Sequence, residues 1–211
     1  IVEAAGGTLD YSPTGVYASV PDAVVVVLSE QPYAEGNGDL QNLDWTANAP
    51  LLQVQSLRDL GVPITTLLMS GRPMFVNPEL NLSDAFVASW LPGTEASGIA
   101  DVLFSDTQGN VVFDMTGKLS FSWPGGAINP NNADAPVAAN LFDRGYGLSY
   151  ADTTQLPSLT QSPNNSQSGI IEGDNGGSLR RYLCKSQNGF ARGGAEPRHS
   201  VLGHQPDRVC P

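Results

Sequence analysis

The chain reads Ala23-Val-Val-Val-Val-Leu28, then Ser29, and then Glu30-Gln-Pro-Tyr-Ala-Glu-Gly-Asn-Gly-Asp39. Six apolar residues in a row predict a strand buried on both faces, as in a parallel sheet. In open α/β sheets, ligands bind in the crevice outside the carboxyl ends of the strands, and loop 30–39 follows such an end. A carboxylate on a glycine-hinged loop can act there as a general acid. A plain polar surface loop is the alternative interpretation.

The apolar pattern further along the chain predicts the rest of an α/β fold. The expected elements are a helix over residues 49–61, strands over 64–69 and 85–91, and a short helix over 98–104. Pro50 suits a first helical turn and Gly61 suits the cap that ends that helix. Together these elements predict a partial, open, mainly parallel sheet flanked by helices. A complete sheet of this kind has more strands, so we expect it to begin upstream of Ile1, truncated on its N-terminal side.

Composition excludes several classes of partner. The formal net charge of −11 argues against nucleic acid, because nothing offsets the repulsion from phosphates. The sequence has no run of about 18 apolar residues, so no membrane span is expected. Cys184, Cys210, His199 and His204 are too loosely spaced for zinc geometry. We therefore expect neither a metal nor a cofactor.

The distribution of charge divides the chain. Residues 1–150 hold 16 acidic and 4 basic side chains, whereas residues 180–211 hold 2 acidic and 6 basic ones, together with both cysteines and both histidines. We expect residues 1–150 to form the α/β domain. Residues 151–177, rich in Ser, Thr, Asn, Gln and Gly, are expected to be a linker. Residues 178–211 are expected to be a disordered or foreign tail with its cysteines unpaired.

Six motifs in a fixed order resemble one family. Glu-x-Pro-Tyr-x-Glu-x-x-Gly-Asp after a Val-rich strand resembles the acid/base loop of glycoside hydrolase family 3, in its β-glucosidase and glucan exohydrolase branch. The five later motifs are Met69-Ser-Gly-Arg-Pro-Met-Phe-Val76, Ser83-Asp-Ala-Phe-Val-Ala-Ser-Trp-Leu-Pro-Gly-Thr-Glu95, Gly98-Ile-Ala-Asp-Val-Leu-Phe104, Thr116-Gly-Lys-Leu-Ser-Phe-Ser-Trp-Pro124 and Leu141-Phe-Asp-Arg-Gly-Tyr-Gly-Leu-Ser-Tyr150. The resemblance covers about residues 20–150 and implies only the C-terminal, flavodoxin-like α/β sandwich domain of that family.

The resemblance implies a role for Glu35, and position in the chain makes four further residues candidates. Glu35 stands where the family has its acid/base carboxylate, and Glu30 at the strand edge is the competitor for that role. Tyr33 and Asp39 are expected either to organise the loop or to bind substrate, and a structural role is favoured over direct contact with a sugar. Arg72 either pairs with a loop carboxylate, Glu35 or Glu30, or forms an exposed or interdomain ion pair. Retaining glycosidases need a second carboxylate about 5–5.5 Å from the first. In this family that nucleophile is an Asp on a preceding (β/α)8 barrel.

The implied function is that of a domain fragment of a retaining, exo-acting β-glucosidase or β-glucan hydrolase. Its partners would be a β-glucoside or β-glucan oligosaccharide and the upstream barrel. The isolated chain is expected to be inactive, because its resemblance supplies no nucleophile. The alternative is a non-catalytic carbohydrate-binding or interaction domain that lacks the barrel. The parent enzyme is expected to be periplasmic or secreted by a bacterium.

Overall fold

A computed structural model describes the greater part of the chain, namely residues 1–34, 36, 38–40, 43–45, 49–126, 140–162 and 179–180. Its elements, in order, are η1 (Glu3–Ala5), β1 (Val24–Ser29), α1 (Ala49–Asp59), β2 (Ile64–Met69), α2 (Asn77–Leu82), β3 (Ala85–Ala88), η2 (Gly93–Glu95), α3 (Ser97–Leu103), β4 (Trp123–Pro124), β5 (Asn140–Phe142), β6 (Gln155–Leu156) and β7 (Leu179–Arg180). Within these residues, no helix combines the length and the apolarity needed to cross a lipid bilayer.

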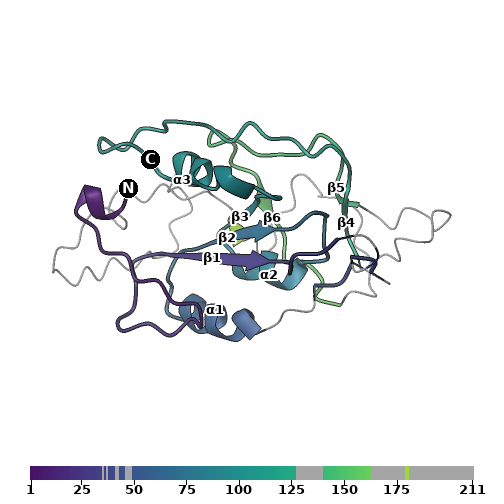
Figure 1. Cartoon of the computed structure of the whole chain (residues 1–211), viewed down its shortest axis with the longest axis horizontal. Coiled ribbons are helices and arrows are strands. Elements are labelled where there is room, and N and C mark those ends of the chain that lie inside the picture. Colours follow the sequence, from purple (N-terminus) through teal and green to yellow (C-terminus); the bar gives the residue numbers. More distant parts are fainter. Residues whose placement is uncertain are drawn as a thin grey trace.

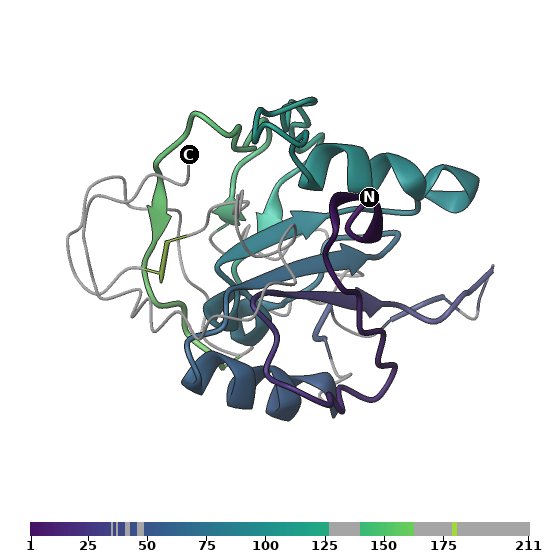
Figure 2. The ribbon, with the colours of Figure 1, turned by 90° about the vertical axis from the view of Figure 1, so that its left-hand side faces the viewer.

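A three-stranded parallel sheet in the order β1-β2-β3 organises the fold. Its register pairs Val24 with Ile64 and Thr65 with Ala85. Helices α1 and α2 lie on one face of the sheet and α3 lies on the other (Figures 1 and 2). The predicted α/β class, with a mainly parallel sheet flanked by helices, is therefore confirmed. Because all three strands are parallel, their carboxyl ends lie side by side along the same side of the sheet.

The first strand differs from its prediction in one respect. Leu28 is buried, but Val27 is 53% exposed. The sequence run predicted burial on both faces, yet β1 is an edge strand of the sheet that the structure describes. The third strand also ends earlier than predicted, at Ala88. Two residues later Trp90 has φ +53, which is costly for a bulky residue and incompatible with a continuing strand.

The helix α2 was not predicted. It has only six residues and begins with Pro78 in its first turn, which suits a helix start because the missing N–H would be unpaired there. Six residues are too few to display a helical period in the sequence. The helix α1, in contrast, was predicted, and it stops before Gly61, whose φ of +77 and N–H bond to the carbonyl of Arg58 end it.

One apolar cluster joins the sheet to the later part of the chain. Its buried members are Leu28, Trp45, Leu68, Met74, Val76, Leu80, Trp123, Leu141, Phe142, Leu156 and Leu159. Leu156 and Leu159 belong to the stretch that composition assigned to the linker. That stretch is also held by side chains of α2. Asn81 exchanges two hydrogen bonds with the backbone of Leu159, at 2.8 and 2.9 Å, and Asn77 donates to the carbonyl of Thr160 at 3.0 Å.

Candidate active-site loop at the carboxyl edge of the sheet

Three polar segments follow the carboxyl ends of the parallel strands. Glu30 comes directly after β1, Ser70 directly after β2, and Ser89 directly after β3. The backbone N–H of Glu30 still donates to the carbonyl of Met69, so the ladder between β1 and β2 continues to the first residue of the loop. This ladder fixes where the loop starts, because a rigid sheet carries it.

The carboxylate of Glu30 is engaged at both oxygens. Its Oε1 accepts a hydrogen bond from Nε of Arg72 at 3.1 Å. Its Oε2 lies 2.5 Å from the hydroxyl of Ser70 and accepts from the backbone N–H of Gly71 at 3.3 Å. The side chains of Glu30 and Arg72 are only 13% and 20% exposed. Glu30 therefore binds the turn after β2 to the end of β1.

Arg72 joins the two ends of the candidate loop. Besides its ion pair with Glu30, it donates from Nη1 to the carbonyl of Gly38 at 2.6 Å. Its guanidinium also lies over the ring of Tyr33, 4.2 Å from the ring centroid, a cation–π geometry. The sequence left the partner of Arg72 open. In the described residues that partner is Glu30.

Glycines in the loop and in the turn after β2 are of two kinds. Gly36 has φ +76, a left-handed conformation that favours glycine, and a Cβ there would meet nothing within 4 Å. Gly38 and Gly71 have no such φ, but a Cβ at either position would collide with Tyr33. Two backbone bonds shape the return of the loop, from Gly38 N–H to the carbonyl of Ala34 and from Asp39 N–H to that of Gly36. Asp39 is exposed.

Glu35, the expected acid/base residue, lies outside the described residues. Its neighbours Ala34 and Gly36 are described, and so are Glu30, Tyr33, Asp39 and Arg72. The structure thus defines the flanks and the anchors of the loop. Cys184, Cys210, His199 and His204 also lie outside the described residues. Of the expected tail, the structure describes only Leu179 and Arg180, which form β7 and pair with β6. Among the residues that are described, His, Cys, Asp and Glu side chains form no group of three or more that could hold a metal ion.

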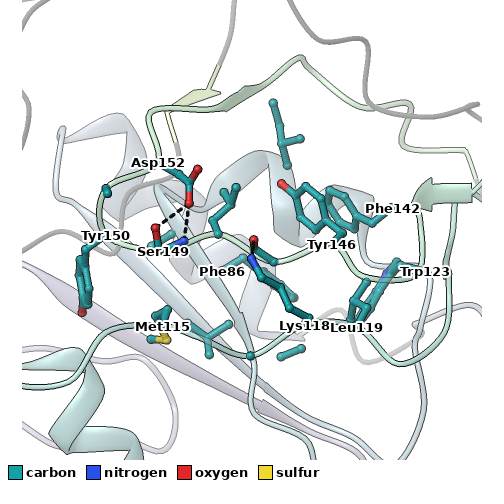
Figure 3. Close-up of a pocket in the computed structure, with 18 of the residues that line it drawn as sticks. Phe86, Met115, Lys118, Leu119, Trp123, Phe142, Tyr146, Ser149, Tyr150 and Asp152 are labelled. Carbon is teal, nitrogen blue, oxygen red and sulfur yellow. Dashed lines mark hydrogen bonds between the residues drawn. The ribbon is translucent and has the colours of Figure 1, made fainter.

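A second feature is a cavity of about 490 Å³ beside β3 (Figure 3). It lies between residues 85–88 of that strand and the segments 115–119 and 146–153. Phe86, Phe142, Tyr146 and Trp123 are among the aromatic residues that line it, and Trp123 is buried in the core.

Polar groups at the cavity rim are already engaged. Lys118 donates to the carbonyl of Gly147. Asp152 accepts from both the backbone N–H and the hydroxyl of Ser149 at 2.7 Å, and these bonds lower the pKa of Asp152. Tyr150 donates to the carbonyl of Val102, and burial raises the pKa of its hydroxyl. The lining of this cavity is mainly apolar, whereas the loop after β1 carries the carboxylates that acid/base chemistry needs.

Two acidic residues outside the loop are partly or fully buried. Asp84 accepts from the backbone N–H of Ile64 at 2.8 Å and pairs with Arg58 at 2.7 Å, so it ties the starts of β2 and β3 together. Glu79 on α2 was not singled out. It is 4% exposed, and its two carboxylate oxygens have no hydrogen-bond partner within the part of the chain that the structure describes. Burial, with a smaller contribution from Asp44, raises its pKa to about 7.

Comparison with known proteins bears on the loop and on the fold around it. The family model described as the glycosyl hydrolase family 3 C-terminal domain matches residues 8–150. The lysosomal beta glucosidase of Dictyostelium discoideum is 35% identical over 200 residues, which are 90% of this chain and 23% of that protein. The periplasmic beta-glucosidase of Salmonella typhimurium is 32% identical over 141 residues, 56% of this chain and 18% of that protein.

A solved structure is similar over most of the chain. The exo-1,3/1,4-β-glucanase from a Pseudoalteromonas species matches 78% of this chain and 21% of its own, with 44% identity and a TM-score of 0.69. The chain thus spans about a fifth to a quarter of the length of these relatives.

Proposed function

This chain belongs to glycosyl hydrolase family 3 through that family's C-terminal domain, and from this premise we propose that it supplies the acid/base carboxylate of a retaining, exo-acting β-glucosidase or β-glucan hydrolase. Glu35 is the proposed acid/base residue, because it occupies the family position in the loop after β1. The substrate class is a β-glucoside or β-glucan oligosaccharide. The nucleophile would be an Asp on a (β/α)8 barrel domain of the same enzyme.

The observation that carries the choice of Glu35 is the engagement of Glu30. A general acid must hold a proton and direct it at the oxygen of the leaving group. Both oxygens of Glu30 instead face donors of the protein, and one of these donors is the guanidinium of Arg72. A carboxylate in that position serves as an anchor. Glu35 and Asp39 are then the remaining carboxylates of the loop motif, and of these two Glu35 occupies the acid/base position of the family.

The anchoring of the loop supports the same role. Catalytic groups must be held within about 0.5 Å of their productive geometry, which requires neighbours that fix them. Here the strand ladder fixes residue 30 and Arg72 fixes residue 38, so both ends of the segment that carries Glu35 are tied to β2 and its following turn. In the first step Glu35 would protonate the departing oxygen, and in the second it would take a proton from water.

Kinetics of acid/base variants test this proposal. In the full-length polypeptide that carries this domain, Glu35→Gln is expected to lower turnover of a poor-leaving-group β-glucoside by about 10²–10⁴-fold. A 2,4-dinitrophenyl β-glucoside needs no protonation of its leaving group, so its first step is expected to be nearly unaffected. Unchanged turnover of the poor-leaving-group substrate in Glu35→Gln would refute the assignment.

The isolated 211-residue chain provides a second test. Retaining hydrolysis proceeds through a covalent glycosyl-enzyme, and the family resemblance places no nucleophile on this chain. The purified chain is therefore expected not to hydrolyse an aryl β-glucoside. Measurable turnover that Glu35→Ala abolishes would mean that this chain alone holds both carboxylates, contrary to the proposal.

A further inference from the structure

We propose that Tyr33 is a positioning residue for the candidate acid/base loop, and that Gly38 and Gly71 are glycines because they make room for its ring and for its hydroxyl, respectively. The inference deepens the proposed function, and only its kinetic part rests on Glu35 being the acid/base residue. Its structural part concerns residues whose positions are described: Tyr33, Gly38, Gly71 and Arg72.

Gly38 and Gly71 both lie against the side chain of Tyr33. Neither Gly38 nor Gly71 has a left-handed φ, so backbone conformation does not demand glycine at either position. A Cβ at Gly38, however, would lie 2.3 Å from Cδ2 of Tyr33, and one at Gly71 would lie 2.5 Å from its Oη. Real Cβ atoms essentially never come so close to another heavy atom. The side chain of Tyr33 is therefore what restricts both positions to glycine.

Arg72 packs on the ring of Tyr33. Its guanidinium covers one face of the Tyr33 ring at 4.2 Å from the centroid, and the same group donates to the carbonyl of Gly38. The edge of the ring contacts Gly38 and its hydroxyl reaches Gly71. Tyr33 thus occupies a slot made of the return limb of its own loop, the turn after β2 and a cation that is itself held by Glu30.

Tyr33 and Gly38 lie on opposite sides of Glu35 in the sequence. Tyr33 precedes Glu35 by two residues and Gly38 follows it by three. The ring contact between Tyr33 and Gly38, with the Gly38 N–H bond to the carbonyl of Ala34, therefore fastens the backbone on both sides of Glu35. Without the ring, Arg72 would hold Gly38 by a single hydrogen bond, and the two limbs could separate.

In this arrangement Tyr33 positions the loop and does not serve as a stacking platform for a sugar ring. Tyr33 is 43% exposed, but one face of its ring lies under the guanidinium and its hydroxyl end lies at the backbone of Gly71. The ring and not the hydroxyl makes the contacts with Arg72 and Gly38. Phenylalanine is accordingly expected to replace Tyr33 with little loss, whereas alanine is not.

Hydrogen exchange in the 211-residue chain tests the structural part. Gly38→Ala is expected to raise the exchange rates of amides in residues 31–39 at least tenfold, because the added methyl expels the ring. Gly98→Ala is the matched control, since a Cβ at Gly98 meets nothing within 4 Å and its φ is not left-handed. It is expected to leave these rates unchanged.

A double-mutant cycle separates the ring from any other effect of the methyl group. In a Tyr33→Ala background, whose loop already exchanges fast, Gly38→Ala is expected to change the rates less than twofold. An equal change in the parent chain and in the Tyr33→Ala background, or no change in either, would overturn the proposal. Both outcomes are independent of catalysis.

Kinetics of the full-length polypeptide test the positioning role. Tyr33→Ala is expected to lower kcat/KM for phenyl β-glucoside at least tenfold more than for 2,4-dinitrophenyl β-glucoside, and Tyr33→Phe is expected to restore the ratio. If Glu35→Gln shows this leaving-group dependence and Tyr33→Ala does not, positioning by Tyr33 is wrong. If Glu35→Gln itself lacks the dependence, the proposed function fails, while the exchange data still decide whether Tyr33 holds the loop.

Discussion

Arg72 donates from Nε to Oε1 of Glu30 across 3.1 Å, joining the turn after β2 to the first residue after β1. The two residues are 42 positions apart in the sequence, and the parallel pairing of their strands brings them together. Because Arg72 also holds Gly38, one guanidinium determines where the loop begins and where it returns. The ion pair therefore has a local architectural role that an exposed surface pair would not have.

Replacement of Arg72 by lysine is expected to destabilise the chain. One ammonium on a flexible stem cannot donate to Glu30 and Gly38 in the geometry of the guanidinium, and hydrogen bonds to charged groups are each worth about 1.5–3 kcal/mol. We expect Arg72→Lys to lower the free energy of unfolding by roughly 1–3 kcal/mol in urea titrations.

Arg58→Lys is the control for that measurement. Among the described residues, Arg58 forms a second ion pair, with Asp84. The side chains of this pair are 26% and 31% exposed, so solvent screens it more than the pair of Arg72 and Glu30, and we expect it to contribute about 1 kcal/mol or less. Equal losses for the two substitutions would show that Arg72 does no more than a surface arginine.

Burial of the Glu79 carboxyl is expected to make the stability of the fold depend on pH. Its pKa of about 7 in the fold lies above the ordinary 4.5, so the folded chain retains a proton that the unfolded chain releases between these two values. Stability from this group is fully present below pH 4.5 and is lost as the pH rises through about 7. The total loss is about 3 kcal/mol.

Glu79→Gln removes this titration. Compared with the parent chain, the variant is expected to gain about 3 kcal/mol in relative unfolding free energy between about pH 4.5 and about pH 8, because it has no buried charge to form. Chemical denaturation of both chains at several pH values measures the gain. Parallel pH profiles would contradict the account of Glu79.

Residues after the family match are expected to stabilise the domain. The match ends at residue 150, but Leu156 and Leu159 are buried in the core and Asn81 exchanges hydrogen bonds with Leu159. Burying a leucine side chain is worth about 1.5–3 kcal/mol, so a chain that ends at Tyr150 is expected to be less stable by roughly 3–6 kcal/mol than one that ends at Ser162. Equal unfolding midpoints for the two chains would refute this.

The sequence predicted the sheet better than the site, for physical reasons. The strand Ile64–Met69 was predicted with its observed bounds, because a buried strand of apolar residues between turn residues has a direct signature. The engagement of Glu30 depends on strand pairing across 42 residues, and the burial of Glu79 depends on α2, which is too short to show a period. The fit of Tyr33 against Gly38 and Gly71 is a matter of atomic distances that no spacing in the sequence encodes.

Trapping by azide tests the central claim most directly, namely that Glu35 and not Glu30 is the acid/base residue. In the full-length polypeptide, the glycosyl-enzyme of Glu35→Gln lacks a base to activate water, and azide needs none. We expect azide to speed the turnover of 2,4-dinitrophenyl β-glucoside by Glu35→Gln and to yield β-glucosyl azide, with no such product from Glu30→Gln. Azide rescue of Glu30→Gln, with Glu35→Gln as active as the parent enzyme on poor-leaving-group substrates, would contradict the account.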